Sequence, residues 1–441
     1  MTDFNRRELL RRTGLAAAAL ACPRLLRAEQ ESMKPNFIII LADDLGYGDV
    51  GCYGNRDIHT PSLDAMARSG VKFTDFHSNG AVCSPTRAAL LTGRYQQRCG
   101  VEGVITAARH RDEGMALEEV TFAEVLKSAG YATALFGKWH LGYQAAFNPV
   151  RQGFDEFRGF VAGNVDYQSH IDQTGRVDWW RGDKLEKESG YTTDLITNHA
   201  LDFINRNKDR PFCLYLPHAA PHYPYQSRGD KADRSPGKPT PIGGSRQDKA
   251  AAYAEMIEAM DDGIGRIIKR LDELKLTRKT LVFFFSDNGP GGIGSAGPLR
   301  ARKGSLYEGG HRVPAIACWP GTIKAGTIAD APAMGADLLP TMASLAGAPL
   351  PKGRTIDGVD VSPVLLEGKR PAEQAMFWRF GPQKAVRMGP WKLYVAKDRT
   401  ELYNLADDLG EKTDLAAKHT ERVKELGELL AAWEKQVEPK E

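Results

Sequence analysis

The sequence predicts an α/β fold: a large doubly wound sheet, mixed but mostly parallel and flanked by helices, and a smaller C-terminal domain of antiparallel sheet plus one helix. Short apolar runs alternate with amphipathic segments, which is the pattern of buried strands separated by helices. Several of the runs stop abruptly at polar residues. The chain of 441 residues exceeds the length at which one core usually stops growing, so a second unit is expected.

The apolar runs lie at residues 37–41, 132–136, 212–216 and 281–285. The first is rich in Ile, as expected of a strand covered on both faces. In a doubly wound sheet the carboxyl ends of the strands share one edge, and ligands bind there. The polar residues that follow the four runs are therefore expected to meet in one cleft.

Helical patterns separate these runs. Residues 61–69 and 122–129 each end before a glycine, 193–204 are amphipathic, and 253–274 carry a continuous apolar stripe typical of core packing. Residues 226–249 are polar and rich in Gly and Pro. They predict an exposed loop, either disordered or folded over the edge of the sheet.

The composition shifts again at residues 348–357, where Pro and Gly cluster. We therefore divide the chain into a large domain at residues 33–350 and a small α+β domain at 351–441. In the small domain, short strands are expected at residues 375–380, 385–388, 392–396 and 401–405, and a terminal helix at 423–437.

The N-terminus carries most of the positive charge. Residues 1–28 contain six arginines against Asp3 and Glu8, while the whole chain has a formal charge of +3. The remainder is nearly neutral, which gives no support for nucleic-acid binding. Arg6 and Arg7 followed by a short apolar run resemble a twin-arginine export signal, and no other stretch approaches transmembrane length.

We therefore expect an exported protein, periplasmic or secreted, with no transmembrane segment in its mature form. A basic N-terminal arm and a lipoprotein signal ending at Cys22 are the alternatives. Of the other cysteines, Cys52, Cys99, Cys213 and Cys318 lack zinc-site spacing. Cys52 with Cys99 is a candidate disulfide.

The most informative stretch is Cys83-Ser84-Pro85-Thr86-Arg87, which leads into residues 88–94. Ser84 suits an N-cap and Pro85 the first helical position, so a loop turns into a helix with Cys83 at its mouth. The free N–H groups and the dipole of such a helix start favour an anion. Arg87 can hold that anion from the same face. For an isolated cysteine, the alternative is a small buried apolar residue.

Acidic side chains follow the first and last apolar runs. Asp43 and Asp44 come after the first, and Asp287 and Asn288 after the last. All four offer hard oxygen atoms, which suit Ca²⁺ or Mg²⁺ better than a transition metal. An isolated Asp-Asp pair is more often a cap or a solvated bend.

The string C-S-P-T-R-A-A-L-L-T-G-R resembles the signature of the type I sulfatases, which belong to the alkaline-phosphatase superfamily. D-D-L-G-Y-G-D and S-D-N-G resemble the two halves of the divalent-metal site of that family. Lys138 and His140 in G-K-W-H-L-G, His222 in A-P-H-Y-P and Lys303 in R-K-G-S-L-Y-E-G-G match further motifs of the family. The resemblance covers about residues 36–347, and the C-terminal part is similar to the small domain of the family.

The resemblance implies a sulfuric ester hydrolase. It implies that a formylglycine-generating enzyme or an equivalent maturase oxidises Cys83 to formylglycine (3-oxoalanine), whose hydrated aldehyde is the nucleophile. Arg87 and Lys138 would stabilise that nucleophile and the ester, and His140 would take a proton. His222 and Lys303 would bind the sulfate and protonate the leaving group. The metal, usually calcium with magnesium as the alternative, would be bound by Asp43, Asp44, Cys83, Asp287 and Asn288.

The expected substrate is a sulfated carbohydrate or an aryl sulfate, and similarity to arylsulfatases and N-acetylgalactosamine-6-sulfatases favours a sulfated glycan. Residues 163–167 with His170, Trp179 and Trp180 could stack against a sugar ring, or they could pack their own loop. A phosphate or phosphonate monoester hydrolase of the same superfamily is one alternative function, although the cysteine signature and both lysines favour sulfate. A catalytically silent glycan-binding protein is the other.

Overall fold

The structure is a computed structural model that describes residues 34–238, 243–370 and 372–438. The expected export signal at residues 1–28 lies outside the described residues. A sheet of ten strands with the order β11-β2-β10-β9-β1-β8-β4-β5-β6-β7 forms the centre of the described part. Its strands are β1 (Asn36–Ala42), β2 (Val71–Phe73), β4 (Ala132–Lys138), β5 (Glu156–Phe160), β6 (Trp180–Arg181), β7 (Lys184–Leu185), β8 (Phe212–Pro217), β9 (Thr280–Ser286), β10 (Ala315–Cys318) and β11 (Thr327–Ala329).

The middle of this sheet is parallel. β1 lies between β8 and β9, with Ile38 opposite Leu214 on one side and Val282 on the other. β4 and β5 continue the parallel order beyond β8. β10 is antiparallel to β9 and β2, and β6 and β7 form an antiparallel edge. The prediction of a mixed, mostly parallel, doubly wound sheet is confirmed.

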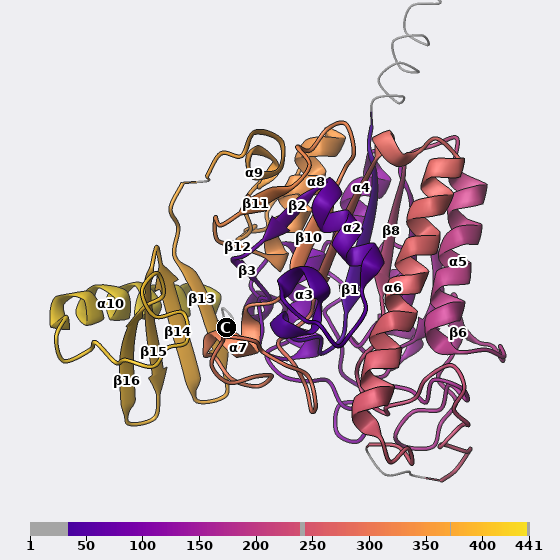
Figure 1. Cartoon of the computed structure of the whole chain (residues 1–441), viewed down its shortest axis with the longest axis horizontal. Helices are drawn as coiled ribbons and strands as arrows, with labels where there is room; N and C mark the ends of the chain where they lie inside the picture. The colour runs from indigo at the N-terminus through magenta and orange to yellow at the C-terminus, as the bar shows by residue number, and fades with distance from the viewer. Residues whose placement is uncertain (1–33, 239–242, 371, 439–441) are drawn as a thin grey trace, which may run out of the picture.

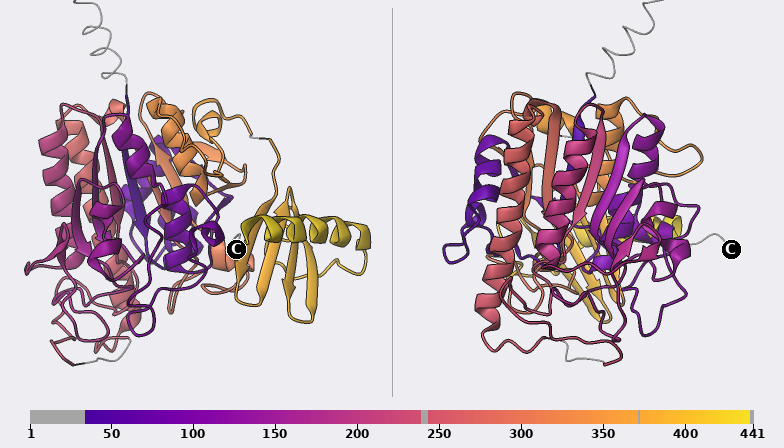
Figure 2. Two further views of the ribbon diagram at one scale, coloured as in Figure 1. Left: turned by 180° about the vertical axis from the view of Figure 1, so that it is seen from behind. Right: turned by 90° about the vertical axis from the view of Figure 1, so that its right-hand side faces the viewer.

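Helices cover both faces of the sheet because successive side chains of a strand point to opposite faces. Ile38 and Ile40 of β1 pack against one set of helices, and Phe37, Ile39 and Leu41 against the other. Figure 2 shows α5 and α6 side by side over one of these faces. That face carries α2 (Pro61–Ser69), α5 (Thr192–Asn207) and α6 (Lys249–Glu273), and the opposite face carries α3 (Cys83–Thr92), α4 (Phe122–Ser128), α8 (Leu338–Ala346) and α9 (Ser362–Glu367).

A separate antiparallel sheet follows near the C-terminus, as predicted. Its core includes Trp378, Leu393, Leu402 and Trp433. Figures 1 and 2 show it beside the large sheet, close to the short helix α7 (Glu308–His311). It consists of β13 (Met376–Phe380), β14 (Gln383–Met388), β15 (Trp391–Ala396) and β16 (Arg399–Asn404), with α10 (Thr420–Val437) packed on it. The division into domains at residue 350 stays a prediction.

The remaining elements are short. β3 (Phe76–His77) and β12 (Ala333–Met334) form a two-stranded parallel pair. None of the helices in the described part of the chain has the length and apolar character needed to cross a membrane. Single turns of 3-10 helix lie at Tyr47–Asp49, Gly51–Tyr53, Gln96–Cys99, Ala145–Phe147, Pro149–Arg151, Thr277–Lys279 and Gly335–Asp337.

Two local predictions are wrong. Helix α3 begins at Cys83 with Val82 in the N-cap position, so Ser84 is not the N-cap and Pro85 is not the first helical residue. The Ser84 hydroxyl instead accepts a hydrogen bond from the Ile105 backbone N–H at 3.1 Å. Cys52 and Cys99 are free thiols and form no disulfide.

Candidate active site

The predicted site residues meet at the carboxyl edge of the large sheet. Asp43 and Asp44 directly follow β1, and Asp287 and Asn288 follow β9. The other candidates come from the neighbouring elements, and their contacts with these acids are given below. They are Lys138 at the end of β4, His140 two residues later, His222 after β8, Cys83 and Arg87 on α3, and Lys303 in the segment before α7.

The acidic residues form one buried cluster. The Asp287 carboxylate accepts the Asp44 backbone N–H at 3.1 Å, and the Asn288 amide donates to Asp44 Oδ1 at 2.8 Å. Asp44 has a φ of 67°, which is uncommon for a residue other than glycine. Such backbone geometry persists only where the surroundings enforce it, and it clusters at functional sites.

Three cations balance these carboxylates. Arg87 donates to Asp287 Oδ2 at 2.8 Å and to the Lys138 carbonyl at 3.0 Å. Lys138 Nζ lies 2.6 Å from Asp43 Oδ2, and both Arg87 and Lys138 have no exposed surface. Lys303 Nζ lies 2.6 Å from Asp44 Oδ1. Buried charges are tolerated when they are paired in this way.

Cys83 lies within this charged cluster. Its Sγ is 3.4 Å from Asp43 Oδ1 and 3.5 Å from Lys303 Nζ. The side chain is buried, yet it lines a cavity of about 490 Å³ that His140, His222 and Lys303 also line. The thiol therefore faces a polar cavity and is not packed into an apolar interior.

The two histidines are held as specific tautomers by backbone carbonyls. His140 Nε2 lies 3.0 Å from the Ile105 carbonyl, and His140 Nδ1 has no partner among the residues that the structure describes. His222 Nδ1 lies 2.8 Å from the Tyr223 carbonyl, while its Nε2 is 3.6 Å from Asp44 Oδ2. Because a carbonyl can only accept, the proton of each ring lies on the nitrogen that contacts it. The other nitrogen keeps a lone pair.

Burial and neighbouring charges shift the protonation of the acidic groups in opposite directions. Burial raises the pKa of Asp43 to about 7, against the lowering effect of Lys138. Burial also acts to raise the pKa of Asp44, but Lys303 and His222 outweigh it and hold that pKa well below its usual range. Asp44 is therefore the firmly ionised member of the pair.

The basic groups and the thiol also shift. Burial lowers the pKa of His140, with Lys138 acting in the same direction, and it lowers the pKa of His222 to about 3. Burial acts to lower the pKa of Lys303, but Asp44 outweighs it, so that pKa is raised and the ammonium stays charged. Burial also raises the pKa of the Cys83 thiol.

The donor set fits a divalent cation. Ligand atoms of Asp43, Asp44, Cys83 and His222 lie within 4.8 Å of one another. The amide nitrogen of Asn288 contacts Asp44, and its Oδ1 is buried and has no hydrogen-bond donor within the described part of the chain. An orphaned carbonyl oxygen next to a carboxylate pair is a ligand that a hard cation would satisfy.

The cavity also contains residues that the motifs did not indicate. Apart from Tyr223, which lies in the A-P-H-Y-P string, and Asn164, which lies in the 163–167 stretch, they are ordinary residue types outside the family strings, so their sequence carries no signal. Tyr143 and Tyr223 supply aromatic surface, and further polar groups come from Thr106, Asn164, Asp172, Gln173 and Thr174.

The expected sugar-stacking residues are only partly in place. Asn164 and Gly163 line the cavity. Trp179 does not: it is 1% exposed, stacks on His170 at 4.3 Å and donates to Glu188. Of the two alternatives, packing within their own loop therefore holds for Trp179 and His170, and the Trp180 indole N–H donates to Asp178 at 2.6 Å. Asp166 and Tyr167 are not among the residues that line the cavity either, and both side chains are fully buried.

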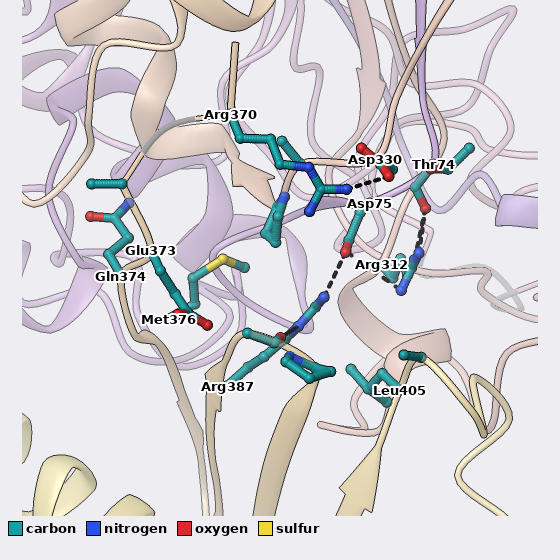
Figure 3. A pocket seen from close by; sticks show the side chains of 16 residues that line it. Thr74, Asp75, Arg312, Asp330, Arg370, Glu373, Gln374, Met376, Arg387 and Leu405 are labelled. Carbon is teal, nitrogen blue, oxygen red and sulfur yellow. Dashed lines mark hydrogen bonds and ion pairs between the residues drawn. The ribbon is translucent and has the colours of Figure 1, made fainter. Parts of the chain in front are cut away.

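A second, larger cavity of about 620 Å³ lies between the two sheets (Figure 3). Its arginines point at partners and not into free space. Arg387 donates to both oxygens of Asp75 at 2.6 Å, Arg312 donates to a backbone carbonyl, and Arg370 pairs with Asp330. Because these charges are already neutralised, the described residues that line this cavity offer no free cation for an anion.

A second group of possible metal ligands lies near this cavity, namely His77, Glu308 and His311. The Arg387 guanidinium lies 3.0 Å from His77 Nε2, and Lys392 Nζ lies 3.2 Å from His311 Nε2. Lys392 also pairs with Glu308 at 2.9 Å. Cations already occupy the directions from which these groups would bind a metal, so the group is a structural network.

Comparison with known proteins decides the family. The family model described as Sulfatase matches residues 35–348. The chain belongs to the sulfatase family. It is 37% identical over 401 residues to arylsulfatase A of Homo sapiens, spanning 82% of this chain and 74% of that protein. It is 35% identical over 389 residues to N-acetylgalactosamine-6-sulfatase of Canis lupus familiaris, spanning 82% of this chain and 71% of that protein.

Solved structures agree. The crystal structure of Ps i-CgsB matches this sulfatase with a TM-score of 0.82 and 31% identity, over 91% of this chain and 92% of that chain. Ps i-CgsB has also been solved in complex with k-i-k-neocarrahexaose. This sulfatase is a sulfuric ester hydrolase, and its family in general uses a metal ion and formylglycine.

Proposed function

We propose that this sulfatase releases sulfate from monoesters on sulfated glycans, with formylglycine at position 83 and a bound calcium ion. One observation carries the proposal: Cys83 lines a cavity beside Asp43 and Lys303, at the start of a helix, where an anion is favoured. The converted side chain would supply a hydrated aldehyde as the oxygen nucleophile.

Asp43, Asp44, Cys83, Asp287 and Asn288 are the residues that would hold the cation. The bound cation would polarise the sulfate and lower the pKa of the nucleophile. Calcium is preferred over magnesium because the donors beside position 83 are oxygens from the loops after β1 and β9 and include an amide, which suits its flexible coordination. The buried, partnerless Asn288 Oδ1 supports this assignment.

Arg87 and Lys138 act as fixed positive charges under the reacting group. Both are fully buried and anchored, Arg87 on Asp287 and Lys138 on Asp43. Since they are oriented before the substrate arrives, they stabilise the charge that develops on the ester without reorganisation.

His140 is the base. Its Nε2–H donates to the Ile105 carbonyl, so the partnerless Nδ1 keeps the lone pair that accepts a proton. His222 and Lys303 bind the sulfate and supply the proton of the leaving alkoxide. Lys303 is the member that stays protonated, because Asp44 raises its pKa.

The sugar would bind where Tyr143, Tyr223 and Asn164 line the cavity. Aromatic rings that present an apolar face with a polar edge suit a sugar ring. The crystal structure of Ps i-CgsB with k-i-k-neocarrahexaose supports a glycan as the substrate class. A maturase partner and export directed by residues 1–28 complete the proposal.

Peptide mass spectrometry across residue 83 tests the proposal, combined with turnover of nitrophenyl sulfate and nitrophenyl phosphate by the same preparation. We expect the mass of the aldehyde and faster release of sulfate than of phosphate. Converted protein that releases no sulfate would overturn the proposal. A panel of sulfated monosaccharides tests the glycan part, which fails if only aryl sulfates are hydrolysed.

A further inference from the structure

The segment that carries Lys303 is held from the C-terminal sheet. Lys303 reaches Asp44 and Cys83 with its Nζ, at 2.6 Å and 3.5 Å. A lysine side chain has four flexible carbons, so an exact position of Nζ requires a fixed backbone at its base. The backbone next to Lys303 lies in a segment without helix or strand, between β9 and α7.

Gln383, the first residue of β14, supplies two bonds to that segment. Its Nε2 donates to the Gly304 carbonyl at 2.9 Å, and its Oε1 accepts the Leu306 backbone N–H at 3.1 Å. The Tyr394 hydroxyl donates to the same Oε1 at 3.2 Å and fixes the amide. One side chain therefore satisfies a carbonyl and an N–H that no regular element would pair.

Gly304 also ties this segment to the nucleophile. Its N–H donates to the Ala81 carbonyl at 2.8 Å, two residues before Cys83. Gly304 has a φ of +83°, which glycine adopts without strain. Gln383, Gly304 and Ala81 thus form a chain of hydrogen bonds from the C-terminal sheet to the start of α3.

Other contacts keep the C-terminal sheet in register with this segment. The ring of Tyr394 stacks on Tyr307 with 4.3 Å between centroids. The Trp378 indole N–H donates to the Ser78 carbonyl at 2.9 Å, in the loop that precedes Cys83. Figure 1 shows β13 and β14 beside α7. The sheet therefore touches the segment that precedes Cys83 and the segment that follows Lys303.

We propose that Gln383 is a positioning residue for sulfate ester hydrolysis, which acts through Lys303 by fixing the backbone on its C-terminal side. The inference rests on the proposed role of Lys303. The primary amide of Gln383 both donates to the Gly304 carbonyl and accepts from the Leu306 N–H. A carboxylate keeps the acceptor but loses the donor, and an alkyl side chain loses both.

Gln383→Leu and Gln383→Glu test this in protein converted at position 83, with Lys384→Met as the matched control. Lys384 is the adjacent residue, and it pairs with Glu434 on α10 at 2.9 Å. We expect Q383L to lower kcat by about tenfold to a hundredfold, the range that displacement of a catalytic group by about 1 Å produces. Q383E should lower kcat less, and K384M should keep wild-type kcat.

The deciding measurement repeats Q383L in a Lys303→Ala background. Q383L should cause no further loss of kcat there, because the group through which it acts is gone. The same fold loss in both backgrounds would overturn the inference. A wild-type kcat in folded Q383L would also overturn the inference. If Q383L does not fold, a wild-type kcat in folded Q383E would overturn it. Wild-type kcat in K303A would instead refute the proposed role of Lys303.

Discussion

Replacing Arg87 should weaken the fold and stop turnover together. The side chain has no exposed surface and donates to the Asp287 carboxylate and the Lys138 carbonyl. Arg87→Ala leaves a carboxylate without its partner in the interior, which costs about 3–5 kcal/mol of unfolding free energy. Arg87→Lys keeps the charge but lacks the planar fork, and one unpaired acceptor costs about 1–3 kcal/mol.

Urea unfolding followed by tryptophan fluorescence measures this cost, and sulfate release measures the activity. We expect kcat to fall by about 10²–10³ in R87K, the usual effect of losing one preorganised donor. Arg151→Ala is the control, because its ion pair with Asp183 is largely exposed and contributes about 1 kcal/mol at most. The reasoning is refuted if R87A unfolds within about 1 kcal/mol of the wild type.

Three further predictions follow from the site and the core. Chelation with EDTA should abolish sulfate release and lower the melting temperature, and added calcium should restore both. At a calcium concentration of 100 Kd, binding should add about 2.7 kcal/mol to the free energy of unfolding. Identical melting temperatures with and without EDTA would contradict the metal site. Neither ring nitrogen of His218 has a partner within the described residues, and burial lowers its pKa to about 4. The unfolded chain, with a histidine pKa of about 6.5, binds more protons between these values, so stability falls as the pH drops, by up to about 1.4 kcal/mol per unit. The free energy of unfolding of His218→Leu, measured in urea, should therefore rise relative to that of the wild type as the pH falls from 6.5 to 4. A difference between the two proteins that does not change with pH would refute this. Tyr223→Ala should raise KM for a sulfated sugar by about threefold to tenfold with little change in kcat, consistent with the loss of about 0.5–1.5 kcal/mol of ring contact; an unchanged KM would remove Tyr223 from the sugar site.

The central sheet could be predicted because its signals are local. Every residue of β1 is buried, and all of them except Asn36 are apolar. Such a run has few alternatives to a central parallel strand. Once the strands are parallel, their carboxyl ends share an edge, which brings Asp44 and Asp287 together although 243 residues separate them. Topology, and not local sequence, makes the site.

Residue type misleads where a tertiary contact competes with a local preference. Ser84 has the right chemistry for an N-cap, but its hydroxyl is used by the Ile105 N–H, 21 residues away. Trp179 has the right chemistry for sugar stacking, but its indole N–H finds Glu188 and its face finds His170. Residue type alone does not tell which way a side chain points.

Other features had no sequence signal at all. Gln383 contacts Gly304 across 79 positions, and a single glutamine at the start of a strand is unremarkable in a sequence. Tyr143 enters the cavity from a loop whose path is set by the surrounding fold. Such contacts become visible only when the two sheets and their connecting segments are placed in space.

The most direct test of the account is sulfate release per molecule, measured against the fraction of protein that is converted at residue 83. Preparations made with graded amounts of maturase supply the range, and mass spectrometry of the peptide gives the fraction. The account predicts a straight line through the origin, with no release from protein that retains Cys83. Equal release at every fraction would contradict it.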